Sequence, residues 1–234
     1  MTDSDSHSDE GAATADSLTR LSDCPDWDYL LREFELLYRP GFAGGSKIIR
    51  SHRKRVRETL AAIIDSNPPI HARPPETKPV VAHLGRAFDV GARYALFGLS
   101  RATERIAHLL TWEYGYQRIP KALARKYAYC EVLGPQGPIV TDRLILGYVL
   151  FAPNTTYPQH HHKDIEESYI SISGNWSEND QAVYAPGSLI LNRSGDQHRI
   201  TTGERDPCLL AYAWTGPAEK LAKPGMDFSK KPVA

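Results

Sequence analysis

The chain has 234 residues, of which 41% are hydrophobic and 24% are charged, an ordinary composition for a soluble globular protein. Basic and acidic residues both number 28, so the zero net charge excludes a general attraction to nucleic acid or to anionic membranes. No stretch approaches 18 apolar residues, the N-terminus lacks an apolar signal region, and the three cysteines form no CxxC pair. We therefore expect a cytoplasmic protein with reduced thiols and no membrane segment.

The N-terminal half predicts helices. Residues 1–16 are acidic and rich in Ser and Ala, which is typical of a disordered leader, and residues 17–125 form the predicted helical region. The basic segment SHRKRVR is interpreted as a solvated helix face, because no aromatic residues interleave its charges. The predicted helices cover DWDYLLREFELLYR up to Pro40-Gly41, the segment from Ser46 as its N-cap to Pro68, residues 79–97, and residues 100–114.

The C-terminal half predicts strands. Short β-branched or aromatic runs, separated by turn clusters rich in Gly, Pro, Asn and Ser, follow one another at roughly ten-residue spacing. This pattern favours a small antiparallel barrel or sandwich over residues 126–217, with residues 218–234 as a loose tail. The fold class is therefore α+β. The predicted strands lie in KYAYCEVL, RLILGYVLFA, ESYISIS, SLILN and CLLAYAWT.

One segment, YPQHHHKDIEESY, concentrates the side chains that bind metal ions. Residues two apart share a face of a strand, so His160 and His162 point the same way, as Glu167 and Tyr169 do on the next strand. A further histidine, His198, follows the turn residue Gly195 and can return into the same interior. Three imidazoles and one carboxylate leave coordination positions open, as in a catalytic metal site.

The spacing of these residues matches two motifs of one superfamily. His160, His162, Glu167 and Gly174 fit the pattern HxHx4Ex6G. The pattern Gx5PxGx2Hx3N is matched at Gly187, Gly195 and His198, with departures at Arg193, where Pro is usual, and at Thr202, where Asn is usual. In these motifs the chain resembles the cupins. The resemblance implies a C-terminal double-stranded β-helix, or jelly-roll barrel, behind an N-terminal α-helical region.

Among cupins the chain resembles the dimethylsulfoniopropionate (DMSP) lyases, most closely the DddL type, through YPQHHHKDIEESYISISGNW and APGSLILNRSGDQHRITT. The resemblance implies cleavage of DMSP to dimethyl sulfide and acrylate with one divalent metal ion, which could be Zn, Fe, Mn, Co or Ni. It also implies a tyrosine base two residues after the metal-binding glutamate, at Tyr169. The family more often has three residues between the second histidine and the glutamate, which leaves Glu166 as an alternative to Glu167. Strand alternation from Tyr169 and the distance to Gly174 favour Glu167.

The substrate's sulfonium end requires an aromatic wall that accepts a cation, without a competing carboxylate. The predicted wall residues are Trp176, Tyr212 and Trp214, and Tyr157 is predicted as a second catalytic or binding tyrosine because it precedes the ligand strand. The other residues that could bind a metal are not predicted to belong to the site. We expect His161 and Asp164 to lie on the surface, and a structural role for His52, His71, His83 and His108.

Two other functions fit the same ligands. A cupin dioxygenase or isomerase would act on another small carboxylate, and a non-catalytic cupin would only bind a ligand; the open coordination position argues against the second. Cupins commonly pair, so the helical half is either a cover for the site or the surface of a homodimer. No nucleic-acid or membrane partner is expected.

Overall fold

The computed structural model describes residues 19–39, 45–116 and 118–228, so the leader predicted for residues 1–16 lies outside the described part. Helices precede residue 126 and strands follow it, except for one short helix near the C-terminus. The helices are α1 (Pro25–Leu37), α2 (Lys47–Asp65), α3 (Leu84–Gly91), α4 (Phe97–Ile106), α5 (Lys121–Ala124) and α6 (Ala218–Ala222), with 3-10 turns at Leu21–Asp23, Pro79–His83 and Ala107–Leu109. The strands are β1 (Tyr127–Leu133), β2 (Ile145–Phe151), β3 (Thr156–His161), β4 (Glu166–Ser173), β5 (Trp176–Glu178), β6 (Val183–Tyr184), β7 (Leu189–Asn192), β8 (His198–Thr202), β9 (Cys208–Thr215) and β10 (Asp227–Phe228).

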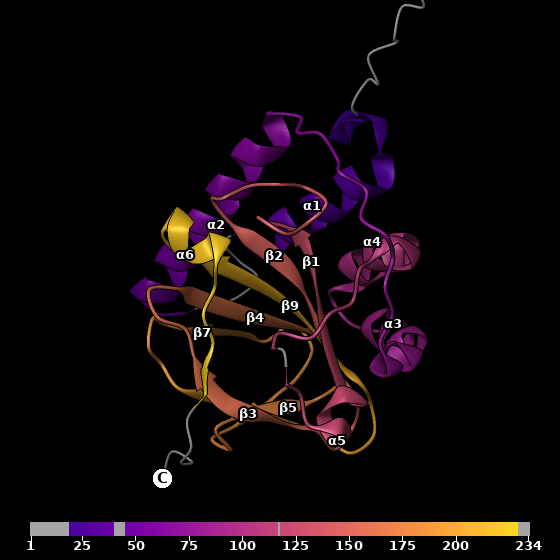
Figure 1. Ribbon diagram of the computed structural model, residues 1–234, viewed down its shortest axis with the longest axis vertical. Coiled ribbons are helices and arrows are strands. Elements are labelled where there is room, and N and C mark those ends of the chain that lie inside the picture. The colour runs from indigo at the N-terminus through magenta and orange to yellow at the C-terminus, as the bar shows by residue number, and fades with distance from the viewer. Residues whose placement is uncertain (1–18, 40–44, 117, 229–234) are drawn as a thin grey trace, which may run out of the picture.

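The strands form two five-stranded sheets. The large sheet has the order β1-β2-β9-β4-β7 and the small sheet the order β10-β3-β8-β5-β6, and the described strand pairs within both are antiparallel. Among the described residues, no strand pair joins one sheet to the other, so the predicted barrel is a two-sheet jelly roll and not a closed ring. In Figure 1, α1 and α2 lie above the large sheet, and β3 and β5 of the small sheet lie below it. The α+β class is confirmed.

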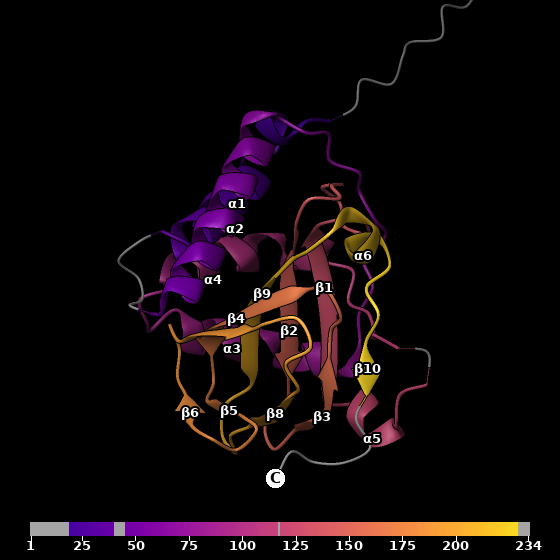
Figure 2. The same cartoon turned by 90° about the vertical axis from the view of Figure 1, so that its left-hand side faces the viewer.

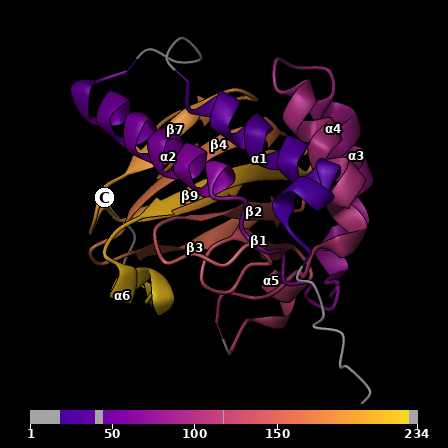
Figure 3. The same ribbon diagram turned by 90° about the horizontal axis from the view of Figure 1, so that it is seen from above.

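The first two helices form where the apolar spacing predicts them. Trp27, Leu30 and Phe34 are buried along one stripe of α1, and Pro25 takes the first helical position, where a missing N–H costs nothing. Ser46 caps α2 by accepting a hydrogen bond from the amide of Ile49 at 3.4 Å. Both helices cross over β9 and β4, as the view from above shows (Figure 3).

The next two helices differ from their predicted bounds. The run predicted over 79–97 is a 3-10 turn followed by α3, which ends at Gly91. A Cβ at Gly91 would lie 2.9 Å from the hydroxyl of Ser100 and 3.0 Å from the side chain of Ile172, so α3 ends where it packs closely against α4 and β4. The helix predicted over 100–114 begins earlier and ends earlier, at Ile106. Sequence periodicity does not show such close approaches, because they depend on tertiary packing.

The basic segment of α2 is not solvated throughout. Arg53 is buried and donates to the backbone carbonyls of Leu37 and Arg39. Arg55 reaches Glu166 on β4. The prediction of a solvated face is therefore wrong for Arg53, whereas Arg55 stays exposed while it connects α2 to β4.

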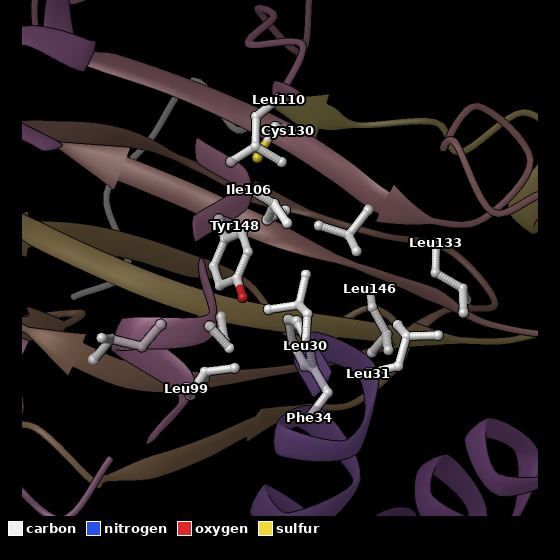
Figure 4. Close-up of a cluster of buried hydrophobic side chains, with 14 of the residues drawn as sticks. Leu30, Leu31, Phe34, Leu99, Ile106, Leu110, Cys130, Leu133, Leu146 and Tyr148 are labelled. Atoms are coloured by element: carbon white, nitrogen blue, oxygen red, sulfur yellow. The ribbon is translucent and has the colours of Figure 1, made fainter. Parts of the chain in front are cut away.

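An apolar core lies between the helices and the outer face of the large sheet. Figure 4 shows Leu30 and Phe34 of α1 pointing toward Leu146 and Tyr148 of β2. The hydroxyl of Tyr148 is 2.6 Å from that of Thr103 on α4, so the polar atom that enters this layer is paired. The helical region and the strands thus share one core.

The segment after Pro217 is not the loose tail that we predicted. Within the described residues it forms α6 and then β10, where Asp227 and Phe228 pair with His161 and His160 of β3. Figure 2 shows this segment running down from α6 to β10 alongside β3. The C-terminal segment therefore extends the small sheet next to the predicted metal ligands.

Candidate active site

The four predicted metal ligands meet between the two sheets. His160 on β3 pairs directly with His198 on β8 in the small sheet, and Glu167 comes from β4 in the large sheet. The potential ligand atoms of His160, His162, Glu167 and His198 all lie within 4.8 Å of one another, and all four side chains are buried. Residues far apart in sequence are brought together because both sheets direct alternate side chains inward.

Each histidine is oriented by a backbone carbonyl. The Nδ1 atoms of His160, His162 and His198 lie 2.9 Å from the oxygen of Pro158, 3.1 Å from that of Gly225 and 3.1 Å from that of Asp196. A carbonyl oxygen only accepts hydrogen bonds, so each Nδ1 carries the proton and each Nε2 offers a lone pair. Such outer partners fix the ring orientation of metal-binding histidines.

The inner atoms of this cluster fit a cation. Nε2 of His162, Nε2 of His198 and Oε2 of Glu167 are buried without a hydrogen-bond partner. The carboxylate oxygen is 3.0 Å from Nε2 of His198 and 3.6 Å from Nε2 of His162. Buried acceptors that face one another are costly unless a positive charge lies among them. The donor set of three imidazoles and one carboxylate suits a divalent metal ion.

The electrostatics favour the metal-binding forms of two ligands. Burial and the neighbouring His198 lower the pKa of His160 to about 3, so its imidazole is neutral at physiological pH. Burial alone would raise the pKa of Glu167, but the close approach of His198 and His162 outweighs it and holds that pKa well below its usual range. A neutral imidazole and an ionised carboxylate are the forms that bind metal.

The structure distinguishes Glu167 from Glu166. Oε1 of Glu167 accepts a 2.6 Å hydrogen bond from the indole nitrogen of Trp214, which leaves Oε2 facing the histidines. Glu166 points to the other face of β4, where it lies 3.3 Å from Nδ1 of His52 and pairs with Arg55. The geometry therefore supports Glu167 as the ligand. His52 is buried among polar partners, which agrees with a structural role.

A cavity of about 200 Å³ adjoins the cluster. Tyr212 and Trp214 of the predicted wall line it, together with Tyr157 and Tyr169. Trp176 does not: it is buried behind Tyr169, with ring centroids 5.9 Å apart, and its indole nitrogen donates to the hydroxyl of Ser171. The prediction of Trp176 as a wall residue is wrong, because its short strand turns the indole into the core.

The two tyrosines predicted for catalysis differ in their surroundings. Tyr169 is buried beside the cluster, with its ring centroid 6.2 Å from that of His198, and burial together with the Glu167 carboxylate raises its pKa well above the usual value. Tyr157 packs edge-on against His160, and its hydroxyl donates to Tyr127 at 3.3 Å. Of these two tyrosines, Tyr169 is therefore the one whose pKa responds to Glu167 of the candidate metal site.

Two positions of the second cupin motif have a structural function: Thr202, which departs from the pattern, and Gly195, which matches it. Thr202, in place of Asn, donates to the carbonyl of Ala152 at 2.9 Å and accepts from the amide of Thr155 at 3.0 Å. Gly195 has φ +81°, which a residue with a side chain rarely adopts, and its amide donates to the carbonyl of His162. This turn joins the two halves of the ligand set.

Several site residues were not predicted. Gly225, whose carbonyl holds His162, and Met226, which lines the cavity, come from the C-terminal segment, where the sequence shows no periodic pattern. Tyr127, Tyr129 and Glu131 also line the cavity from β1. Their two-residue spacing in YAYCEVL indicates one polar face and could have identified them.

Two facing antiparallel sheets with three inward histidines and a glutamate define a cupin. Within that class, residues 52–210 match the model of the dimethylsulfoniopropionate lyase family, and the chain belongs to this family. No helix in the described ranges is long and apolar enough to cross a membrane.

Individual relatives agree with this assignment. A candidate dimethylsulfoniopropionate lyase, DddL, of Cereibacter sphaeroides is 70% identical over 210 residues, which are 90% of each chain. The fold is similar to that of the DMSP lyase DddQ of Ruegeria pomeroyi DSS-3, with a TM-score of 0.65 and 20% identity over 90% of this chain and 99% of the other. A chain from the structures of the DMSP lyases RdDddP and RnDddQII gives a TM-score of 0.63, 20% identity and coverages of 88% and 98%.

Proposed function

We propose that this chain is a metal-dependent DMSP lyase that cleaves its substrate by β-elimination, with Tyr169 as the base. The family membership and the 70% identical relative support the reaction class and favour it over an oxygenase or an isomerase. The observation that carries the proposal is the convergence of orphaned ligand atoms and Tyr169 at one end of an aromatic cavity.

DMSP carries a carboxylate at one end and a sulfonium at the other. Elimination removes a proton from the carbon next to the carboxylate, forms a double bond to the next carbon, and breaks the bond from that carbon to sulfur. The bonding electrons leave with sulfur as neutral dimethyl sulfide, and the remaining product is acrylate. The difficult step is the proton transfer, because a carbon beside a free carboxylate is a weak acid.

The metal-binding residues in this proposal are His160, His162, Glu167 and His198. When bound, a divalent cation supplies positive charge that stabilises the negative charge developing on the substrate carboxylate and favours the phenolate form of Tyr169. All four side chains are buried, which limits the access of water to them.

Tyr169 is proposed to take the proton. A phenol ordinarily titrates near 10, so its phenolate is a much stronger base than a carboxylate or an imidazole. In this chain burial and Glu167 raise the pKa of Tyr169 further, so its deprotonation depends on a compensating positive charge beside Glu167. The hydroxyl then holds the substrate proton after the transfer.

The aromatic side chains of the cavity are proposed to hold the sulfonium end. Tyr212 and Trp214 pack against each other, with ring centroids 5.6 Å apart, on the strand next to Tyr169. Aromatic faces attract cations, and the attraction is stronger in a desolvated site. Tyr157 is proposed to close the cavity beside His160.

The direct test is product formation. Purified protein incubated with DMSP should release dimethyl sulfide into the headspace and acrylate into solution in equal amounts. Removal of bound metal by a chelator should stop both, and addition of a divalent metal should restore them. Absence of dimethyl sulfide from metal-loaded protein would refute the proposed function.

A further inference from the structure

A second carboxylate lies in the same cavity as the metal ligands. Of the cavity-lining residues, Glu131 and Glu167 are the acidic ones, and Glu131 comes from β1 at the far edge of the large sheet. Its side chain is 8% exposed. The mechanism above gives Glu131 no role, and our expectation of a sulfonium site without a carboxylate did not include it.

The local backbone is shaped around this carboxylate. The amide of Gln136 donates to Oε1 of Glu131 at 2.7 Å. Gly134 has φ +147°, and a Cβ there would lie 2.4 Å from the same oxygen, so the turn can wrap the carboxylate only with glycine at this position. The side chain is thus held in one place facing the cavity.

Glu131 has no ion-pair partner among the described residues. The charge of Arg73 acts on it, but the guanidinium group of Arg73 is paired with Glu113 at 3.0 Å. Burial raises the pKa of Glu131 to about 7, although the amide of Gln136 opposes that shift. A buried carboxylate with no counter-charge is costly to maintain. It suits a site whose cation arrives with the ligand.

The strand register places Glu131 in line with the proposed base. Glu131 pairs with Gly147, Gly147 with Tyr212, and Tyr212 with Tyr169, so these positions form one row across the large sheet. Gly147 leaves room in that row, and the hydroxyl of Tyr212 lies 2.7 Å from where a Cβ of Gly147 would be. The row therefore runs from the base, over an aromatic ring, to the carboxylate.

We propose that Glu131 is the counter-charge for the cationic sulfonium of the substrate. It would select DMSP over carboxylates of the same shape that lack the cationic group. The inference rests on the proposed function. A substrate whose carboxylate lies at the metal ligands extends its sulfonium away from them, toward Tyr212 and Glu131. The sulfur loses its positive charge as the bond to carbon breaks, so its attraction to Glu131 is stronger in the bound substrate than in the transition state. Glu131 thus contributes to binding and selectivity more than to the rate of the chemical step.

The test compares Glu131→Gln with Glu204→Gln, which neutralises an exposed carboxylate outside the cavity lining. At pH 8, Glu131→Gln should raise KM for DMSP by about 10- to 100-fold, the range expected for a lost charged interaction, and change kcat by less than about threefold. Glu204→Gln should leave KM unchanged. Thermal unfolding of both variants verifies that each remains folded.

An isostere without the sulfonium charge separates the effect of that charge from the effect of molecular shape. 4-Methylpentanoate replaces the sulfonium of DMSP by a CH group, and its inhibition constant should be equal in wild type and Glu131→Gln. An equal loss of affinity for DMSP and for the isostere, or an unchanged KM for DMSP, would overturn the inference. Failure of the proposed function is seen separately, as wild-type protein that releases no dimethyl sulfide. In that case calorimetric binding of DMSP and the isostere to wild type and Glu131→Gln still decides whether Glu131 selects the cation.

Discussion

The two faces of the large sheet have opposite chemistry although the same strands form both. On β2, Leu146, Tyr148 and Leu150 point outward into the layer covered by helices, whereas Val149 and Phe151 point inward to the cavity. On β4 the difference is greater, because Ile170 and Ile172 face the helices whereas Glu167 and Tyr169 face the cavity and the candidate metal site.

This contrast indicates that one side of the large sheet contributes mainly to stability and the other mainly to chemistry. The outer layer, between the helices and the large sheet, buries aliphatic side chains, which contribute most of the hydrophobic free energy of folding. The inner layer, between the two sheets, can therefore hold polar and charged groups that reduce stability but perform chemistry. Substitutions on the two faces should therefore separate activity from stability.

The largest expected effect comes from a ligand in the inner layer. His198→Ala removes one imidazole and should lower activity by about 10³-fold or more, because a metal ion contributes several kcal/mol to transition-state stabilisation. Metal content should fall with activity, while the unfolding temperature without metal changes little. The matched control is His161→Ala, since His161 points away from the cluster and is absent from it. Loss of activity in both variants to the same degree would contradict the assignment.

The next largest effect is expected from a substitution in the outer layer that lowers the free energy of unfolding. Phe34 is fully buried between α1 and the sheet, and Phe34→Ala should lower the free energy of unfolding by about 3–5 kcal/mol. At a temperature where the variant is still folded, kcat and metal content should match the wild type. Tyr29→Ala on the same helix, where Tyr29 is 60% exposed, should have little effect. A folded Phe34→Ala protein that had lost its metal would show that the two layers are not independent.

The smallest effect is a pH dependence of stability from Glu131. Its pKa in the folded chain is about 7 against an ordinary value of 4.5, so the folded state holds more protons than the unfolded state between these values. Stability should therefore fall as pH rises from about 4.5 to 7, by on the order of 3 kcal/mol for this group. The charged and titratable groups around it are Arg73, Glu113, Tyr129 and Tyr212.

Denaturant unfolding at several pH values measures this contribution. Glu131→Gln should remove the decrease in this pH range, whereas Glu204→Gln should retain it, because Glu204 is exposed and is not among the groups around Glu131. An unchanged pH profile in Glu131→Gln would mean that Glu131 is not buried as a neutral acid.

Much of the inner layer was predictable from sequence because its determinants are local. The spacing of the histidines around β3, the spacing of Glu167 and Tyr169 in β4, and the glycine turn before His198 are all local patterns that the sequence shows. Strand alternation from Tyr169 also favoured Glu167 over Glu166 as the residue that faces the histidines. Gly225 and Met226 could not be found, because they reach the site by a tertiary path through α6 and β10.

The outer layer was predicted less well in detail. Apolar periodicity located α1 and α2, but the end of α3 depends on how closely Gly91 approaches Ile172, and the burial of Arg53 depends on carbonyls of another segment. Trp176 was misplaced because a three-residue strand does not define which side of the sheet its ring occupies. Each of these features is set by packing between distant segments and not by local pattern.

The most direct test of the central claim is Tyr169→Phe in metal-loaded protein, with metal content and dimethyl sulfide release measured on the same sample. The proposed mechanism predicts one divalent ion per chain, as in the wild type, and a rate about 10²- to 10⁴-fold lower, the usual contribution of a general base. Tyr38→Phe, which removes a hydroxyl on the outer face of β4 bonded to Ser168, should keep near wild-type activity. Tyr169→Phe protein that binds metal and releases dimethyl sulfide at the wild-type rate would contradict the account.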